Sequence, residues 1–136
     1  MYVPFIRDGD KFIECVNSLY NEANGKIDYV FCHQEFNGCQ FENGFYAPHG
    51  ANPADMPAKL RVISGHIHMR QSFGNIFYPG TPRALTKSDA NEIKGIHIFN
   101  DNKFTFYPVP NDVIPPTLLY EIKNKEDIKL VKEALN

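Results

Sequence analysis

Two histidines one residue apart form the most chemically suggestive pattern of the sequence. His66 and His68 stand in the stretch SGHIHMRQ, directly after the apolar run KLRVI. On an extended strand, side chains two residues apart point to the same side, so both imidazoles could face one ligand while Ile67 faces the core. Gly65 would let the backbone pass close to a bound ion or to a neighbouring strand. The pattern is compatible with a metal site at the end of a strand.

A third histidine occupies a similar position. His33 ends the apolar run KIDYVFCH, and a polar, irregular connection over 34–59 separates it from the other two histidines. Ligands of open α/β sheets gather at the carboxyl ends of strands, and imidazole is a common ligand of zinc, iron and manganese. Three imidazoles could hold one ion and leave a position for water. The alternative, that these histidines are polar residues at the rim of a sheet, stays open at this point.

The elements that must position the histidines are about seven strands and two helices. Asp8 or Asp10 can cap a first helix, Asn24-Gly25 can end it, and Asn124 can cap a last helix with Ile128, Val131 and Leu135 on one face. The order predicts an α/β or α+β fold with a mixed β-sheet. Two helices are few for such a sheet, so one face could be covered either by a part of the domain that this sequence lacks or by another chain. The strands are expected at 2–6, 26–33, 60–64, 75–82, 94–100, 103–109 and 117–123.

The composition is that of an ordinary soluble globular protein, with 43% hydrophobic and 22% charged residues in 136. No apolar run is long enough for a transmembrane helix, and the first residues lack the pattern of a signal peptide. Three cysteines without a C-x-x-C pair indicate reduced thiols in a cytoplasm. The net charge of −2 does not favour nucleic acid binding by charge alone. It does not exclude a nuclease, because metal ions can supply the positive charge.

Several stretches together resemble one known superfamily. SGHIH, NIFYPGTP and EIKGIHIF, with FCHQEFNG before them and YEIKNKEDI after them, are similar to the C-terminal half of the calcineurin-like metallophosphoesterases. Within that superfamily they most resemble the bacterial SbcD-type nucleases and the phage recombination endonuclease subunits. The main matching segments lie within about residues 27–100, and they occur in the same order.

The resemblance implies a fold, a site and partners. The fold would be the C-terminal half of a four-layer sandwich, with a partial catalytic domain at 1–116 and a strand and helix at 117–136 leading into a truncated accessory region. His33 and His66 would bind one metal and His68 the other, with manganese expected and iron or zinc as alternatives. The family implies a DNA substrate, a companion ATPase subunit and the cytoplasm of a bacterial or phage-infected cell.

The upstream motifs of the family are missing from the sequence. D-x-H, G-D-x-x-D and G-N-H-[DE] do not occur, and DGDKFIE over 8–14 is interpreted as a helix cap. The chain alone is therefore expected to hold at most one ion, to contain no catalytic residue of its own and to be inactive. A partial gene, a shortened chain and a split enzyme with a separate N-terminal half all fit. Two other hypotheses are a phosphoesterase of small phosphoesters or phosphoproteins and a non-catalytic interaction or oligomerisation module.

Five polar residues near the predicted site could assist it. Gln34 and Glu35 could orient a histidine ligand, and Arg70, Gln71 and Arg83 could contact phosphate oxygens. The alternative is that they are ordinary loop and surface residues.

The remaining histidines and two of the cysteines are interpreted as structural or solvent-facing residues. His49 lies in the polar connection and is expected to be exposed, whereas His97 stands in a strand between two isoleucines and is expected to be structural. Cys32 and Cys39 match no zinc-binding spacing and are expected to be small buried residues or loop thiols.

Overall fold

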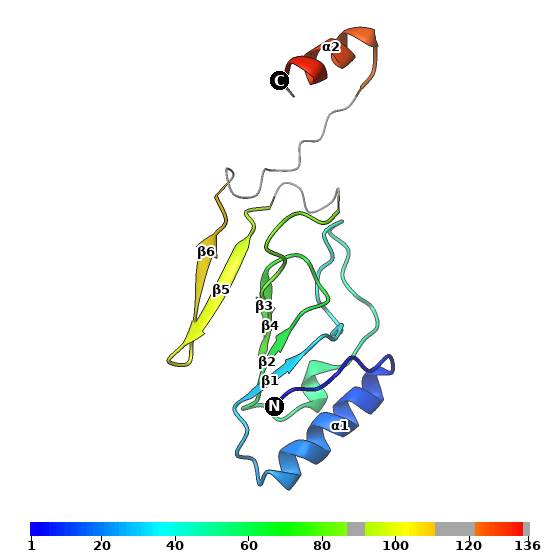
Figure 1. Ribbon diagram of the computed structural model, residues 1–136. Helices are drawn as coiled ribbons and strands as arrows, with labels where there is room; N and C mark the ends of the chain where they lie inside the picture. Colours follow the sequence, from blue (N-terminus) through cyan, green and yellow to red (C-terminus); the bar gives the residue numbers. More distant parts are fainter. Residues whose placement is uncertain (87–91, 111–121, 135–136) are drawn as a thin grey trace.

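The computed structural model describes residues 1–86, 92–110 and 122–134. This part of the chain has a mixed α and β structure, which confirms the predicted fold class (Figure 1). Its elements are α1 (Gly9–Glu22), β1 (Tyr29–Cys32), the 3-10 helix η1 (Pro53–Asp55), β2 (Arg61–Ser64), β3 (Gln71–Phe73), β4 (Ile76–Tyr78), β5 (Gly95–Asn100), β6 (Lys103–Pro108) and α2 (Lys125–Ala134).

A four-stranded mixed sheet forms the centre, with the order β1-β2-β4-β3. β1, β2 and β4 run parallel, and β3 runs antiparallel to β4. Strand β3 was not predicted from the sequence. It is joined to β4 by Gly74, whose φ of +54° lies in the left-handed region that glycine adopts without strain. The parallel strands place the carboxyl ends of β1 and β2 at the same edge of the sheet.

The predicted first strand is reduced to a single bridge. Tyr2 pairs in parallel with Phe31, through hydrogen bonds of 3.0 Å from Val3 N to Phe31 O and 2.9 Å from Phe31 N to Met1 O. Pro4 follows directly and has no N–H to continue the ladder. The segment therefore borders β1 without forming a regular strand.

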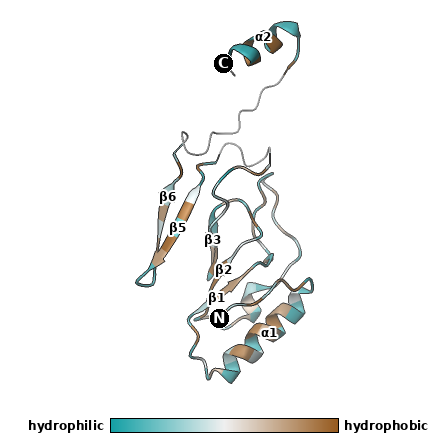
Figure 2. Ribbon diagram, in the orientation of Figure 1, coloured by the Kyte–Doolittle hydropathy of each residue, from teal (hydrophilic) through white to brown (hydrophobic). Residues whose placement is uncertain are grey.

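Helix α1 covers one face of the sheet. Asp8 caps it by accepting hydrogen bonds from the backbone N–H groups of Asp10 and Lys11, as the sequence predicted. The chain turns away after the helix through Asn24 and Gly25, with φ values of +52° and +70°. The buried side of the helix carries Phe12, Ile13 and Val16, and hydrophobic and hydrophilic residues alternate along α1 in Figure 2.

The hairpin of β5 and β6 packs on the opposite face of the sheet through aromatic side chains (Figure 1). The ring of Phe104 lies 4.9 Å from that of Phe77 on β4, and Phe99 lies 5.0 Å from Tyr29 on β1. Asp101 and Asn102 form the turn with positive φ values, as in a two-residue hairpin loop. Helix, sheet and hairpin thus form successive layers, and the complete four-layer sandwich stays a prediction.

The connection over 34–59 is irregular, as predicted, yet it is packed against the body. Phe36, Cys39 and Ala51 are fully buried, and Phe36 forms a bridge with Ala51. The connection therefore adds to the hydrophobic core. This packing fixes the path of the polar residues that it carries.

The predicted cap of the last helix is confirmed, whereas Ile122 and Lys123, the described end of the strand expected at 117–123, are not in a strand. Asn124 caps α2 by accepting hydrogen bonds of 2.8 and 3.1 Å from the N–H groups of Glu126 and Asp127. Most of the strand expected at 117–123, and Leu135 of the expected apolar face, lie outside the described residues. Among the helices described, none is both long and apolar enough to cross a membrane.

Candidate histidine site

The register of the parallel strands brings His33 and His66 together. Cys32 lies opposite Ser64, so the residues that follow β1 and β2 meet at the carboxyl edge of the sheet. The backbone N–H of His66 donates a 3.2 Å hydrogen bond to Nδ1 of His33. The two imidazole centroids are 5.3 Å apart, with the rings nearly perpendicular at 88°. The structure therefore places these two predicted ligands side by side.

Gly65 makes this close approach sterically feasible. A Cβ at this position would lie only 2.6 Å from Nδ1 of His33. Any other residue would force either the imidazole or the backbone after β2 to move. The sequence-based expectation of a close backbone approach at Gly65 is confirmed, with the ring of His33 as the neighbour.

The expected geometry of His66 and His68 is wrong in one respect. Strand β2 ends at Ser64, and His66 has a φ of +56°, so the two histidines do not alternate along an extended strand. Ile67 closes a tight turn with a 2.6 Å hydrogen bond from its N–H to the Gly65 carbonyl, and its side chain is buried as predicted. A left-handed histidine is an uncommon conformation that the surrounding structure must hold in place.

Each of the two histidines lies beside a carboxylate from the 34–59 connection. Glu35 Oε2 is 3.6 Å from Nε2 of His66, and Glu42 Oε1 is 3.6 Å from Nδ1 of His68. Glu42 Oε1 also accepts a 2.9 Å hydrogen bond from the backbone N–H of His68. Glu35 was predicted as a partner of a histidine, whereas Glu42 was missed.

His66 and His68 act electrostatically on His33. Partial burial lowers the pKa of His33, and the nearby His66 and His68 lower it further. A lowered pKa keeps the imidazole of His33 neutral around neutral pH, which is the form that binds metal ions. The charge environment thus favours the ligand form of His33.

The described residues do not form a complete metal site by themselves. No group of three His, Cys, Asp or Glu side chains within them converges so that it could hold an ion. Nδ1 of His33 accepts a hydrogen bond, so the neutral ring carries its proton on Nε2. A metal ion could bind Nδ1 only in place of this hydrogen bond, and it could bind Nε2 only if the proton moved to Nδ1, which would also break the bond. An ion at this edge would need further donors and a small rearrangement of His33.

A buried polar network holds the strand ends that carry the site. Gln34 donates from its backbone N–H to Ser64 Oγ at 2.8 Å, and the Gln34 carbonyl accepts hydrogen bonds from Ser64 Oγ at 2.7 Å and from the Tyr78 hydroxyl at 2.9 Å. The hydroxyl of Tyr78 in turn accepts from the backbone N–H of Phe36 at 3.0 Å. Gln34 therefore fixes the backbone between His33 and Glu35 from within the core.

The other predicted residues have different surroundings. Gln71 exchanges hydrogen bonds of 2.8 and 2.7 Å with the backbone of Gln40, and so holds the connection near Glu42. The guanidinium of Arg70 lies 3.9 Å from the ring centroid of Phe106 on the hairpin. Arg83 is exposed. Gln71 and Arg70 thus make contacts within the fold, and no described contact links Arg83 to the histidines. Contact of these three residues with phosphate oxygens stays a prediction.

Two neighbours of the histidines were not predicted. Lys94 donates a 3.2 Å hydrogen bond from Nζ to the carbonyl oxygen of His68, and a 2.7 Å hydrogen bond to Glu92. The exposed ring of Phe5 lies nearly parallel to that of His66, with centroids 6.1 Å apart. Both depend on contacts between distant segments, and no local sequence signal indicates them.

The interpretations of the remaining histidines and cysteines agree with their environments. His49 is exposed, and His97 packs among Phe77, Phe104 and Phe106 between the hairpin and the sheet. The described chain contains no disulfide, and burial raises the pKa of Cys32 to about 11.

Two known proteins are similar to this chain. A provisionally named phosphoesterase, 244L, of Invertebrate iridescent virus 6 is 37% identical over 110 residues, which cover 79% of this chain and 37% of the viral protein. Exonuclease subunit 1 of Enterobacteria phage T4 is 33% identical over 102 residues, which cover 73% of this chain and 30% of the phage protein. No model of a known protein family matches the chain.

The chain thus spans little more than a third of the viral protein and less than a third of the phage protein. These similarities support a relationship to phosphoesterases and nuclease subunits. They do not show that the chain belongs to the calcineurin-like superfamily.

Proposed function

We propose that the chain is the C-terminal portion of a metal-dependent phosphodiesterase, and more narrowly of a DNA exonuclease or endonuclease of recombination and repair. The observation that carries this proposal is the pairing of His33 and His66 at the carboxyl ends of adjacent parallel strands. The similarity to a viral phosphoesterase and to a phage exonuclease subunit supports it. The calcineurin-like superfamily is the proposed relationship.

In the complete enzyme, His33 and His66 would hold one metal ion and His68 the other. Manganese is the proposed ion, with iron or zinc as alternatives, and such ions clamp a phosphate and supply a hydroxide near neutral pH. Glu35 and Glu42 lie where they can orient the rings of His66 and His68. The histidines of this chain would contribute neutral imidazoles from a rigid sheet edge.

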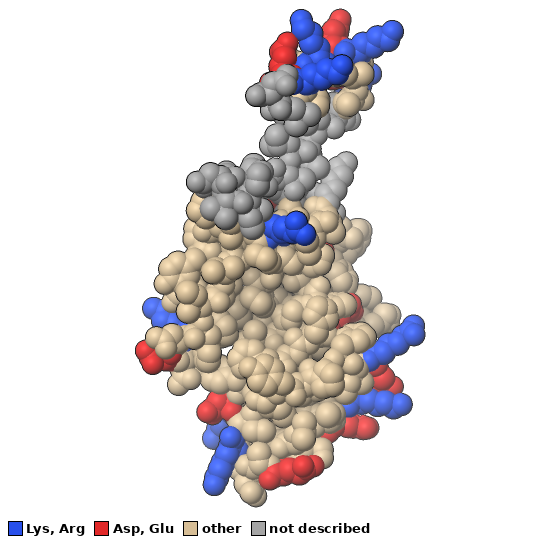
Figure 3. Space-filling model, in the orientation of Figure 1, with Lys and Arg blue, Asp and Glu red and all other residues tan. Residues whose placement is uncertain are grey.

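The chain alone is proposed to be inactive, because the carboxylate motifs of the family are not in its sequence. A separate N-terminal half could supply them, and a companion ATPase subunit and DNA are the further proposed partners. The proposed location is the cytoplasm of a bacterial or phage-infected cell. Figure 3 shows charges of both signs around α1 and on α2, with a largely uncharged centre on that face. Contact with DNA would therefore depend on bound metal and on the other parts of the enzyme.

Elemental analysis of the purified chain after equal exposure to Mn²⁺ and Zn²⁺ tests the site. We expect about one ion per chain, lost in the variant His66→Ala/His68→Ala. His49→Ala is the matched control, because this histidine lies exposed in the 34–59 connection and makes no described contact with the three histidines. An ion that survives the double substitution, or no ion in any variant, would contradict a metal site at these histidines.

Complementation tests the hypothesis of a split enzyme. Addition of a chain carrying D-x-H and G-N-H-D motifs should restore phosphodiesterase activity, and His66→Ala should abolish it. Cleavage of a small phosphodiester but not of DNA would favour the alternative of a small phosphoester or phosphoprotein substrate. Absence of any restored activity would count against a split enzyme.

A non-catalytic interaction module is the second candidate, and the outer face of the hairpin favours it. Ile96, Ile98 and Tyr107 are 51%, 49% and 48% exposed, and Ile96 lies opposite Tyr107 in the register. An exposed apolar strand face of this kind is a common site of association. A dimer that persists at low concentration without metal, and that Ile98→Lys dissociates, would support a homo-oligomer.

A further inference from the structure

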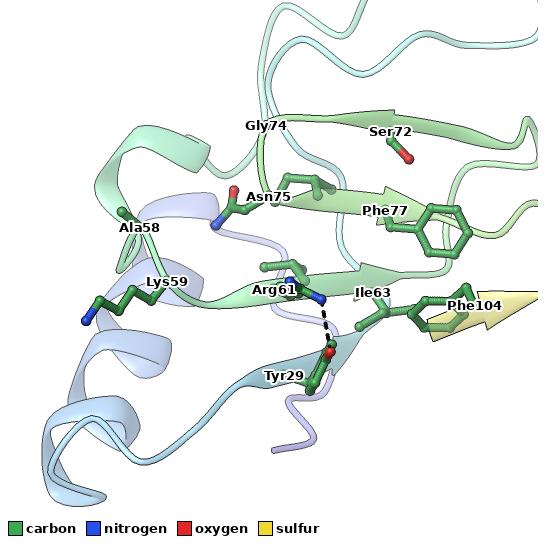
Figure 4. A pocket seen from close by; sticks show the side chains of 12 residues that line it. Tyr29, Ala58, Lys59, Arg61, Ile63, Ser72, Gly74, Asn75, Phe77 and Phe104 are labelled. Atoms are coloured by element: carbon green, nitrogen blue, oxygen red, sulfur yellow. Dashed lines mark hydrogen bonds between the residues drawn. The ribbon is translucent and has the colours of Figure 1, made fainter. Parts of the chain in front are cut away.

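A hollow of about 520 Å³ lies at the amino ends of β2 and β4, where the sheet meets the tip of the hairpin. Its volume falls within the range of roughly 300–1,000 Å³ that is typical of small-molecule sites. Figure 4 shows Ser72, Asn75 and Phe77 on one side of it and Arg61, Ile63 and Phe104 on the other. Because the parallel strands run away from it, the hollow is at the opposite end of the sheet from His33 and His66.

The charge of the hollow differs from that of the chain. Lys59 and Arg61 line it, and no aspartate or glutamate is among its lining residues. The whole chain carries a net charge of −2, with 16 acidic against 14 basic residues. Arg61 donates to the Tyr29 hydroxyl at 3.2 Å and lies 5.8 Å from the ring centroid. This bond fixes the guanidinium beside the hollow and uses one of its five donors. The local charge therefore favours an anion.

The opposite end of the hollow is aromatic. Phe77 and Phe104 pack on each other with their rings tilted by 49°, and both are partly exposed (Figure 4). Asn75 donates from Nδ2 to the Leu60 carbonyl at 2.6 Å, so its Oδ1 remains an acceptor at a fixed position. A flat ring could stack on the two phenylalanines while its edge bonds to this amide. Flat heterocycles with N–H groups fit this arrangement better than aliphatic ligands.

We infer that the hollow binds a nucleobase that carries a phosphate, either as a mononucleotide or as the end of a single strand. The base stacks on Phe77 and Phe104, and the phosphate is bound by Arg61. Lys59 extends away from the rings in Figure 4 and would act as a second, outer charge. The inference is independent of the proposed metal site, because the two sets of residues share no member and lie at opposite ends of the strands.

Chemical-shift mapping of the full, ¹⁵N-labelled chain titrated with dAMP tests the inference. We expect the backbone signals of Arg61, Asn75 and Phe77 to move together. Phe104→Ala should weaken binding roughly tenfold, as for loss of one base–aromatic stack, and Arg61→Gln roughly fivefold. Adenosine and inorganic phosphate, each offering half of the ligand, should bind more weakly than dAMP.

Matched controls separate binding in this hollow from the general effect of losing an exposed arginine or phenylalanine. Arg83→Gln removes an exposed arginine and Phe45→Ala an exposed phenylalanine, neither of which lines the hollow. Both should leave dAMP binding unchanged. Phe104→Leu keeps an apolar side chain in the hairpin and removes only the ring, so it preserves the test if the alanine variant fails to fold.

Three results would overturn the inference. These are no shift with dAMP or with a 5′-phosphorylated oligonucleotide, shifts confined to the histidine end, and equal weakening by Arg83→Gln. Binding of dAMP would identify the mononucleotide as ligand, whereas binding of the oligonucleotide alone would identify a strand end. None of these results bears on the metal site proposed at His33, His66 and His68, which the elemental analysis tests separately.

Discussion

Replacement of Tyr78 by phenylalanine should destabilise the fold by removing one buried hydroxyl. This hydroxyl donates to the Gln34 carbonyl at 2.9 Å and accepts from the Phe36 N–H at 3.0 Å. Tyr78 and Phe36 are both 0% exposed, and Gln34 is 2% exposed, so water cannot replace the lost group easily. Phenylalanine has nearly the same shape and leaves no large cavity. The substitution therefore isolates the polar network that joins β4 to the segment after His33.

The expected loss is about 2–3 kcal/mol in the free energy of unfolding. The Phe36 N–H loses its acceptor, and a buried donor without a partner costs about 1–3 kcal/mol. The Gln34 carbonyl keeps its 2.7 Å hydrogen bond from Ser64 Oγ. Loss of its second hydrogen bond, from Tyr78, therefore costs less, on the order of 0.5–1 kcal/mol. For a chain of this length the melting temperature should fall by roughly 6–12 °C.

Urea denaturation followed by far-UV circular dichroism measures this loss, since the chain contains no tryptophan to report unfolding by fluorescence. Tyr46→Phe is the matched control because Tyr46 is 65% exposed, and it should change stability by less than about 0.5 kcal/mol. Equal midpoints for Tyr78→Phe and Tyr46→Phe, with unchanged slopes, would refute the claim that the network stabilises the strand ends.

Three further outcomes follow from the structure. Gly65→Ala should displace the ring of His33 and lower stability by about 1–3 kcal/mol, as seen in the urea midpoint and in the histidine ring signals; an unchanged spectrum would contradict the close contact. Iodoacetamide at pH 8 should label Cys15 well before Cys32, whose pKa of about 11 leaves on the order of one thiolate in a thousand; peptide mass spectrometry showing the reverse order would contradict the burial. Burial, and then the charge of Arg70, lowers the pKa of His97 below its usual 6.5. The resulting contribution of the neutral imidazole to the free energy of unfolding is complete above pH 6.5 and is lost as the pH falls below it. His97→Phe should flatten the fall in melting temperature over that acidic range, and an unchanged slope would argue against this assignment.

Much of the fold could be predicted because its signals are local. The cap at Asp8, the Asn24-Gly25 ending and the apolar runs of β1 and β2 each specify an element within a few residues. Strand β3 was missed because Gln71–Phe73 has no alternating pattern, and only its pairing with β4 makes it a strand. The first strand was overestimated for the converse reason, since Pro4 ends the pairing that Tyr2 begins.

The candidate site was predictable where it depends on the sheet. His33 and His66 had to meet once β1 and β2 were parallel neighbours with their ends in register. The partnership of His68 with Glu42 and Lys94 depends on the path of the 34–59 connection and on the hairpin, which no local pattern specifies. The left-handed φ of His66 likewise results from the turn that buries Ile67.

The surroundings of the three histidines set an expectation for how tightly the isolated chain can hold a metal ion. In the present arrangement each histidine already has a partner: His33 accepts from the His66 N–H, His66 lies beside Glu35 and His68 lies beside Glu42. A metal ion must replace these interactions by coordination bonds, and the free energy needed to break them offsets part of the binding free energy. The strand ends themselves are rigid, because Gln34 and Ser64 fix them from the core. Rearrangement is thus confined to side chains, which predicts weak binding by the chain alone and tighter binding once further donors complete the site.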